Sequence, residues 1–356
     1  MQPNPSHPAV SQPFIPRSMQ FALFVTGFLW LLASLSAAGH AAQGIATRIN
    51  LSILEAPLEQ VFFLFLLLIG FATLSWVATR FGGIRLSNAL PSRPTAKREF
   101  QLGLAVGWGM LLVAVIPMVL GGTLHPQFWL APRAWLMAVS SLITLAAGTL
   151  ALEVAFRGYL FRRMIDAVGP TLATILLSVI YAIFSSFRPN STSFSVLVTF
   201  LTGILFSLAY LRTHGLWLGW GLHFGWDAAM GVVFGLPVGG LVTYSSLVQT
   251  TTSGRLWLTG GLYGPESALI TALVIIGGMV LLYRHTREYA WAYTHPAIIA
   301  AGYPMDVAPP PAHTAMEQAA AAKPAPLVQI LATTSTVSST MPVIEEHLRS
   351  NSNITE

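Results

Sequence analysis

Long apolar runs separated by short polar segments dominate the chain up to about residue 285. An α-helix needs about 20 consecutive apolar residues to cross the hydrocarbon core of a bilayer. The pattern predicts eight such helices, over residues 19–37, 58–77, 102–120, 135–152, 172–187, 194–210, 216–234 and 268–283. We therefore expect an all-α fold, a polytopic membrane helix bundle of about eight transmembrane helices. The fourth run keeps a helical pattern beyond Leu152, as far as Met164.

The composition supports a membrane protein. Of 356 residues, 54% are hydrophobic and only 9% are charged, whereas soluble domains carry about 25% charged residues. This excludes an ordinary cytosolic enzyme, a nucleic-acid binder and a disordered scaffold, so we expect the lipid bilayer as a partner and no nucleic acid. The chain has no cysteine, which excludes disulfides, thiol catalysis and cysteine-bound metal sites.

The basic residues predict the orientation of the bundle. With both termini in the cytoplasm, the outer loops hold four basic residues, which are Arg48, Arg133, Arg188 and Arg255. The inner segments hold twelve, which are Arg17, Arg80, Arg85, Arg93, Lys97, Arg98, Arg157, Arg162, Arg163, Arg212, Arg284 and Arg287. Cytoplasmic loops of membrane proteins are enriched in Lys and Arg. An integral membrane protein with both termini cytoplasmic is therefore expected.

The chain divides into four segments by composition. Residues 1–18 form a polar cytoplasmic leader, and residues 19–100 hold the first helices and a basic cytoplasmic loop. Residues 101–287 form the main membrane domain. Residues 288–356 are rich in Ala, Pro, Ser and Thr, which predicts a disordered cytoplasmic tail.

Few ionisable side chains interrupt the apolar runs, and each is a candidate for function because such a group is costly in a membrane. Glu153 and Arg157 lie four residues apart at the end of the fourth run, and His223 and Asp227 lie four apart in the seventh. Residues four apart share one face of a helix. Glu266 stands at the entry to the eighth run.

Each pair has a structural and a chemical interpretation. Alone, Glu153 and Arg157 would form an intrahelical ion pair, His223 and Asp227 a satisfied structural pair, and Glu266 a first-turn acid stabilised by the helix dipole. Together, an imidazole oriented by one carboxylate and facing a second carboxylate could activate water for amide hydrolysis. Glu153, His223 and Asp227 are also candidate ligands of a divalent metal such as zinc. Spacing alone leaves these alternatives open.

The two pairs, in this order, resemble motifs of the CPBP family of intramembrane proteases, which includes the CAAX prenyl proteases (Ras-converting enzymes) and bacterial proteins of the Abi type. The family's first motif is EExxxR and its third is HxxxN or HxxxD. The chain has LEVAFRG over 152–158 and HFGWD over 223–227. The stretch GGLYGPE over 260–266 is also similar to bacterial members. The resemblance covers roughly residues 100–285.

This resemblance implies catalytic roles for Glu153, Arg157, His223 and Asp227, in a polar cavity formed by the fourth, fifth and seventh spans. It also implies peptide or membrane-protein substrates and a location in a bacterial inner (plasma) membrane.

Two positions depart from the family pattern. Leu152 stands where the first motif has its first Glu, and Ser185 stands where the second motif, FxxxH, has its His. In the family these positions hold the attacking water between a carboxylate and an imidazole. Leucine cannot accept a proton, and serine is a poor substitute for an imidazole.

The expected function is a CPBP-type endopeptidase that hydrolyses peptide bonds near the membrane, with catalysis weakened by these two departures. The alternative is a non-proteolytic member that binds peptides or partner membrane proteins. A small-solute transporter would need a polar pathway, and the runs supply charged residues in only three places. The sequence contains no HExxH, GxSxG or GxxxxGK[ST] motif.

Overall fold

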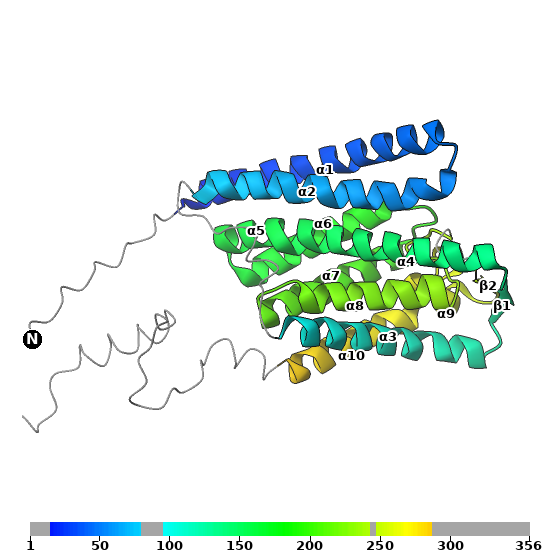
Figure 1. The fold of residues 1–356 in the computed structure, drawn as a ribbon. Coiled ribbons are helices and arrows are strands. Elements are labelled where there is room, and N and C mark those ends of the chain that lie inside the picture. The colour runs from blue at the N-terminus through cyan, green and yellow to red at the C-terminus, as the bar shows by residue number, and fades with distance from the viewer. Residues whose placement is uncertain (1–14, 80–94, 243–246, 287–356) are drawn as a thin grey trace, which may run out of the picture. The chain divides into compact units, whose positions relative to one another are not determined.

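The computed structural model describes residues 15–79, 95–242 and 247–286, which form mainly helices (Figure 1). Most of the predicted leader, the basic loop after the second helix and the predicted tail lie outside these ranges. The longer helices are α1 (Arg17–Arg48), α2 (Glu55–Thr79), α3 (Ala96–Leu120), α4 (Pro132–Glu153), α5 (Phe161–Val168), α6 (Pro170–Ser186), α7 (Ser193–Thr213), α8 (Trp217–Ala228) and α10 (Leu269–His285).

The predicted helical membrane fold is confirmed. Five helical segments of the described chain are long and apolar enough to cross a membrane, namely Arg17–Arg48, Ser52–Ala78, Ala96–Leu120, Pro132–Val168 and Ser193–Thr213. The apolar helices α6 and α10 are shorter. Helix α8 continues into a π-helical segment, Ala229–Val233. Each predicted apolar run therefore overlaps a helix, while the number that span the membrane stays a prediction.

The fourth apolar run continues past Leu152, as predicted. Helix α4 passes into a π-helical segment, Val154–Leu160, and then into α5. This continuous helix, from α4 through α5, ends at Gly169. The φ of Gly169 is 88°, in a region that glycine adopts without steric cost. Pro170 then begins α6, since proline fits the first turn of a helix.

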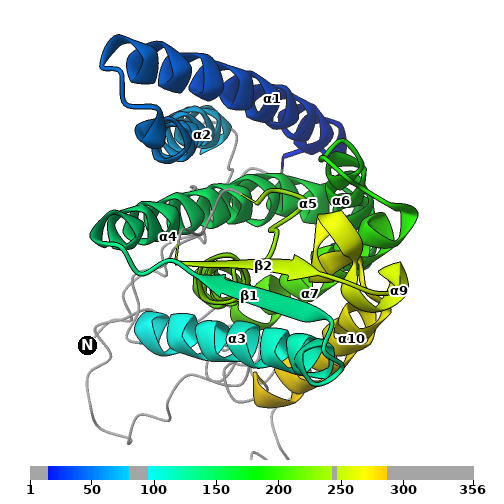
Figure 2. The ribbon, with the colours of Figure 1, turned by 90° about the vertical axis from the view of Figure 1, so that its right-hand side faces the viewer.

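The helices lie in layers. Helices α1 and α2 form an antiparallel pair on one side, α4 and α5 lie beneath them, and α3 and α10 lie on the opposite side, with α7 and α8 between (Figures 1 and 2). The indole N–H of Trp30 in α1 donates to the carbonyl of Leu66 in α2 at 2.9 Å. This bond satisfies a polar group within an otherwise apolar contact.

A small sheet, which the apolar pattern does not predict, crosses one end of the bundle (Figure 2). Strand β1 (Leu124–Phe128) follows α3, and β2 (Val248–Thr252) precedes the short helix α9 (Leu256–Thr259). The strands are antiparallel, with Leu124 opposite Thr252 and Phe128 opposite Val248. The sheet joins two parts of the chain that are far apart in sequence.

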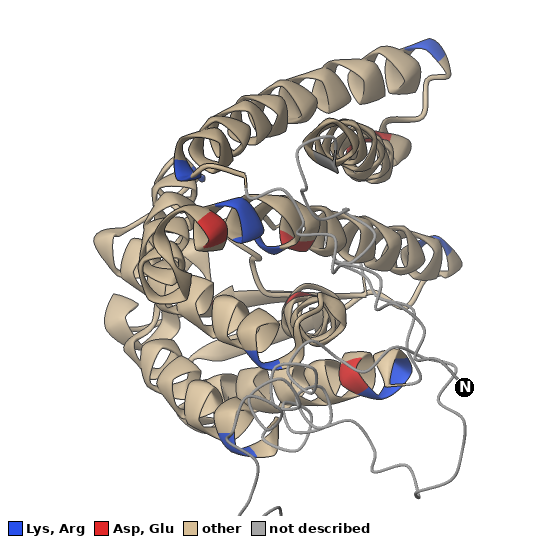
Figure 3. Cartoon of the chain, turned by 90° about the vertical axis from the view of Figure 1, so that its left-hand side faces the viewer, with Lys and Arg blue, Asp and Glu red and all other residues tan. Residues whose placement is uncertain are grey.

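Charged residues are sparse in the described helices (Figure 3). Basic residues lie at the start of α1, near the start of α3 and near the end of α10, at Arg17, Lys97 and Arg284. These helix ends lie at the same end of the bundle, opposite the sheet (Figure 1). That this end faces the cytoplasm stays a prediction.

Candidate active site

Helix α8 carries His223 and Asp227 on the face opposite its contact with α3. A Cβ atom added at Gly221 would overlap the carbonyl of Phe100, and one at Gly225 would lie 2.7 Å from the Leu104 oxygen. Only glycine therefore allows this close approach of the two helices, as at small-residue interfaces of membrane helices. His223 and Asp227 each follow a glycine by two residues, about 200° around the helix. They point away from α3.

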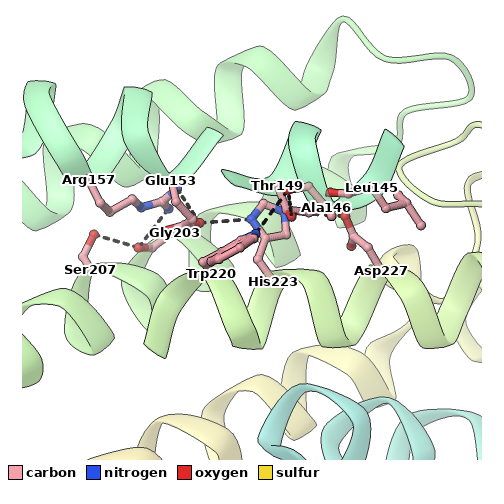
Figure 4. A network of polar contacts seen from close by, with 10 residues as sticks. All are labelled: Leu145, Ala146, Thr149, Glu153, Arg157, Gly203, Ser207, Trp220, His223 and Asp227. Atoms are coloured by element: carbon pink, nitrogen blue, oxygen red, sulfur yellow. Dashed lines mark hydrogen bonds and ion pairs between the residues drawn. The ribbon is translucent and has the colours of Figure 1, made fainter. Parts of the chain in front are cut away.

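Glu153 meets His223 across the bundle (Figure 4). The Glu153 Oε1 atom lies 3.0 Å from Nδ1 of His223 and 3.6 Å from Nη1 of Arg157. Because an ionised carboxylate only accepts hydrogen bonds, Nδ1 is the donor. A Cβ atom added at Gly219 would lie 3.1 Å from Oε2 of Glu153. The carboxylate is therefore enclosed by α4 and α8.

The guanidinium of Arg157 is held by aromatic rings as well as by Glu153. It lies 4.8 Å from the ring centre of Tyr181 and 5.1 Å from that of Phe206, and Nη2 is 3.5 Å from the carbonyl oxygen of Gly203. Arg157 belongs to the π-helical segment, a local geometry that is frequent at functional sites. Phe206 also stacks on His223, with 4.6 Å between ring centres. The imidazole is thereby fixed in orientation.

The His223 ring lies between two carboxylates. While Nδ1 donates to Glu153, Nε2 lies 3.7 Å from Oδ2 of Asp227. The structure thus brings together Glu153, Arg157, His223 and Asp227, the four candidates from the sequence. All four side chains are buried.

The same geometry bears on the candidate metal ligands. Glu153 and Asp227 contact opposite nitrogens of one imidazole, so an ion bound to either nitrogen would face only one of the carboxylates. No group of three His, Cys, Asp or Glu side chains suited to a metal occurs among the residues that the structure describes. The arrangement does not fit a three-ligand zinc site.

A cavity of about 520 Å³ lies beside this network. His223 and Asp227 line it together with many apolar side chains from α1, α2, α4, α6 and α7. Leu152 and Ser185 line it too, and the hydroxyl of Ser185 donates to the carbonyl of Ala182 at 2.8 Å. Positions 152 and 185, which the sequence analysis singled out, therefore both face this cavity.

Three polar residues that line the cavity were given no place at the site by the sequence, although Glu266 was among the candidates. Arg188 follows α6, and Tyr263 and Glu266 precede α10; all three line the cavity with Asp227. Arg188 stands in no motif, whereas Tyr263 and Glu266 belong to the stretch GGLYGPE over 260–266, whose similarity to bacterial family members did not by itself place them at the cavity. Glu266 carried the interpretation of a first-turn acid, but it lies in a 3₁₀ turn, Pro265–Ser267, before α10 begins.

The Glu266 carboxylate faces the cavity from a fixed position. Its Oε2 atom accepts a hydrogen bond of 2.7 Å from the backbone N–H of Gly239. Burial, and then the nearby charge of Asp227, raise the pKa of Glu266 to about 7. Burial also raises the pKa of Tyr263 to about 12, with the charge of Glu266 adding to the effect. This end of the cavity can therefore exchange a proton near neutral pH.

Comparison with known families supports the resemblance inferred from the motifs. Residues 132–229 match the family described as Type II CAAX prenyl endopeptidase Rce1-like. The matching segment runs from α4 into the π-helical segment after α8 and includes all four candidate residues. No curated protein and no solved structure matches the chain.

Proposed function

We propose that this chain, which is similar over residues 132–229 to Type II CAAX prenyl endopeptidases of the Rce1-like family, is an intramembrane endopeptidase. The observation that carries the proposal is the buried contact of Glu153, His223 and Asp227 beside a cavity of about 520 Å³. Cavities of this size suit drug-sized ligands. A short stretch of peptide would enter the cavity with its scissile bond near His223.

Each polar residue has a part in this proposal. Glu153 accepts from Nδ1 of His223 at 3.0 Å, which fixes the ring so that its other edge faces the cavity and Asp227. Arg157 balances the buried charge of Glu153, since a buried charge is retained only with a partner. His223, whose Nε2 lies 3.7 Å from Oδ2 of Asp227, would then donate to the oxygen on which negative charge develops as the peptide carbonyl is attacked.

The expected catalysis is weak. A side chain at position 152 would face the cavity, but leucine offers no proton acceptor, and Ser185 already donates to its own helix. General acid–base catalysis by one positioned side chain contributes factors of about 10²–10⁴. Loss of both family partners therefore predicts turnover well below that of an intact site.

The leucine and serine in the cavity wall also support a second function. A chain with this cavity and no efficient base would bind peptides, or segments of partner membrane proteins, without cutting them. Such binding would use the apolar lining from α1, α2 and α7. It would survive the loss of His223, whereas cleavage would not.

Cleavage by the purified chain in proteoliposomes separates the two functions. The substrates are membrane-tethered fluorescent peptides, one of them ending in a prenylated CAAX sequence. We expect slow cleavage by the wild type, with loss of at least 100-fold in His223→Ala and Glu153→Gln. If the wild type binds the peptides and cuts none, the endopeptidase proposal fails and the binding function stands.

Restoring the family residues tests the cause of weak catalysis. The double substitution Leu152→Glu and Ser185→His places a carboxylate and an imidazole in the wall that both positions line. We expect cleavage to rise by about 100-fold or more. A double variant that folds as well as the wild type and cleaves no faster would contradict this explanation.

A further inference from the structure

The cavity contains a carboxylate from outside the three family motifs, that of Glu266 at the end of the stretch GGLYGPE. Glu266 lines the cavity with His223 and Asp227, although it is separated from them by the whole segment between α8 and α10. Helix α6 ends at Ser186, α8 ends at Ala228 and α10 begins at Leu269, at the end of the bundle that the sheet crosses (Figures 1 and 2). Glu266 therefore lies at the same end of the cavity as Ser185 and Asp227.

The hydrogen bond to Gly239 orients this carboxylate. Oε2 accepts from the Gly239 N–H at 2.7 Å, while Oε1 makes no hydrogen bond within the described chain. One oxygen is thus anchored, and the other is open to a water molecule in the cavity. Glu266 is only partly buried, so water can reach it.

The charged and titratable groups that face Glu266 come from three segments. Asp227 and His223 extend from α8, Arg188 follows α6, and Tyr263 precedes Glu266 in its own loop. Arg188 lines the cavity and forms no ion pair within 4.0 Å and no side-chain hydrogen bond in the described part of the chain. Its charge favours the ionised form of Glu266, whereas Asp227 disfavours it.

We propose that Glu266 is the general base of this chain and takes the place of the water-activating pair that is missing at Leu152 and Ser185. This inference rests on the proposed endopeptidase function. Arg188 is a positioning residue, which acts through its charge on Glu266.

The proposed reaction balances without a further reactant. Glu266 removes a proton from the water, and the water oxygen bonds to the carbonyl carbon of the scissile peptide. His223 donates to the resulting oxyanion from Nε2, which requires protons on both ring nitrogens, since Nδ1 donates to Glu153. When the tetrahedral intermediate collapses, the C–N bond breaks and the proton passes from Glu266 to the departing amine.

The substitution Glu266→Gln isolates the proton-transfer role from the structural role. Its amide oxygen can still accept from Gly239, but the amide cannot accept a proton from water at neutral pH. We expect kcat to fall about 10²–10⁴-fold with little change in Tm. Glu266→Asp keeps a carboxylate and is expected to retain more activity than Glu266→Gln.

The pH profile gives a readout that a structural role would not move. In the wild type, kcat/KM is expected to rise with pH through about 7, the pKa that burial gives Glu266, because the base must be ionised. Arg188→Gln should move this rise of kcat/KM to higher pH, because the charge of Arg188 favours the ionised form of Glu266. Glu266→Gln should abolish the rise.

The outcomes separate the two proposals. Suppose that the wild type cleaves and that the folded Glu266→Gln variant keeps its rate within about threefold. Glu266 is then not the base, and the endopeptidase function still stands. The same conclusion follows if the rise of kcat/KM with pH is unchanged in both Glu266→Gln and Arg188→Gln. A wild type that cuts no peptide overturns both proposals.

Discussion

Glu153 and Leu152 are neighbours in sequence but face different surroundings. Successive residues of a helix point about 100° apart, so Leu152 lines the cavity while Glu153 contacts His223. For this reason a simple exchange of roles between the two positions is not available to the chain. The chemistry of the site depends on which side chain stands at each of these adjacent positions.

Removal of Arg157 tests the buried ion pair. Arg157→Ala leaves the enclosed Glu153 carboxylate without its cation, and loss of one partner of a buried pair costs about 3–5 kcal/mol. We expect a matching fall in the free energy of unfolding in detergent micelles. The exposed Arg255 provides the control, since Arg255→Ala should change it by less than about 0.5 kcal/mol. Equal effects of the two substitutions would contradict the pairing.

The pKa of Glu266 predicts a pH dependence of stability. Because burial raises it to about 7 from a usual value of 4.5, the folded chain binds more protons than the unfolded chain between these values. The free energy of unfolding should therefore fall as pH rises from about 4.5 to 7, by at most about 3 kcal/mol. Unfolding of the wild type and Glu266→Gln across this range measures it, and the variant should lack this part of the slope.

The sequence identified the residues of the buried network and named Glu266, but it did not place Glu266 at the polar end of the cavity with Arg188 and Tyr263. Spacing placed Glu153 with Arg157 and His223 with Asp227, because residues four apart share a helix face. The contact between the pairs followed only from the family resemblance, since spacing says nothing about which helices meet. Arg188 and Tyr263 lie in loops whose positions depend on the packing of the whole bundle.

At the scale of elements, the glycines of α3 and α8 determine how deeply α8 enters the bundle. A Cβ atom at Gly103 or Gly107 would overlap a carbonyl of α8, and one at Gly221 would overlap a carbonyl of α3. The two helix backbones are therefore in direct contact, and α8 cannot move outward without shifting His223. The positions of the catalytic candidates follow from this packing.

One pair of substitutions on α3 tests this contact. Gly103→Ala should force the helices apart and lower the free energy of unfolding by about 1–3 kcal/mol, as overpacking does. Gly109 lies on the same helix with nothing within 4 Å of an added Cβ, so Gly109→Ala should be neutral or slightly stabilising. Thermal unfolding in detergent compares the two. A harmless Gly103→Ala would show that the helices are not so close.

The apolar pattern predicted the helices but neither the sheet nor the π-helical segments. Strand β1 is the short sequence LHPQF, and its partner follows more than a hundred residues later, so no local signal marks the pairing. All seven residues of the π-helical segment around Arg157 are buried, so no alternation of polar and apolar positions marks it. Elements that depend on distant contacts were the ones that the sequence pattern did not reveal.

At the scale of the whole molecule, the outward surface of the helices is apolar. Leu29, Phe65 and Leu136 are each at least 60% exposed, on three different helices. A surface of this kind is stable in lipid and would aggregate in water. Hydropathy predicted the bundle well, because every backbone polar group inside a bilayer must be satisfied within a helix or a closed barrel.

The absence of cysteine makes the predicted orientation directly testable. Ser18 and Lys97 lie at the end of the bundle where α1 and α3 begin, and Ser52 and Gln249 lie at the other; all four are exposed. In intact cells, a membrane-impermeant maleimide should label Ser52→Cys and Gln249→Cys. Ser18→Cys and Lys97→Cys should react only after permeabilisation. The reverse pattern would place both termini outside the cytoplasm.

The sheet across the end of the bundle also sets an order of events during synthesis. Strand β1 leaves the ribosome long before β2. The two strands pair with Leu124 opposite Thr252 and Phe128 opposite Val248. At about 5–20 residues per second, the delay is roughly 10 s. During that time α4, α6, α7 and α8, which carries His223, leave the ribosome, whereas Glu266 is synthesised only after β2. The cavity that Glu266 lines is therefore complete only after β2 and the segment before α10 have been synthesised.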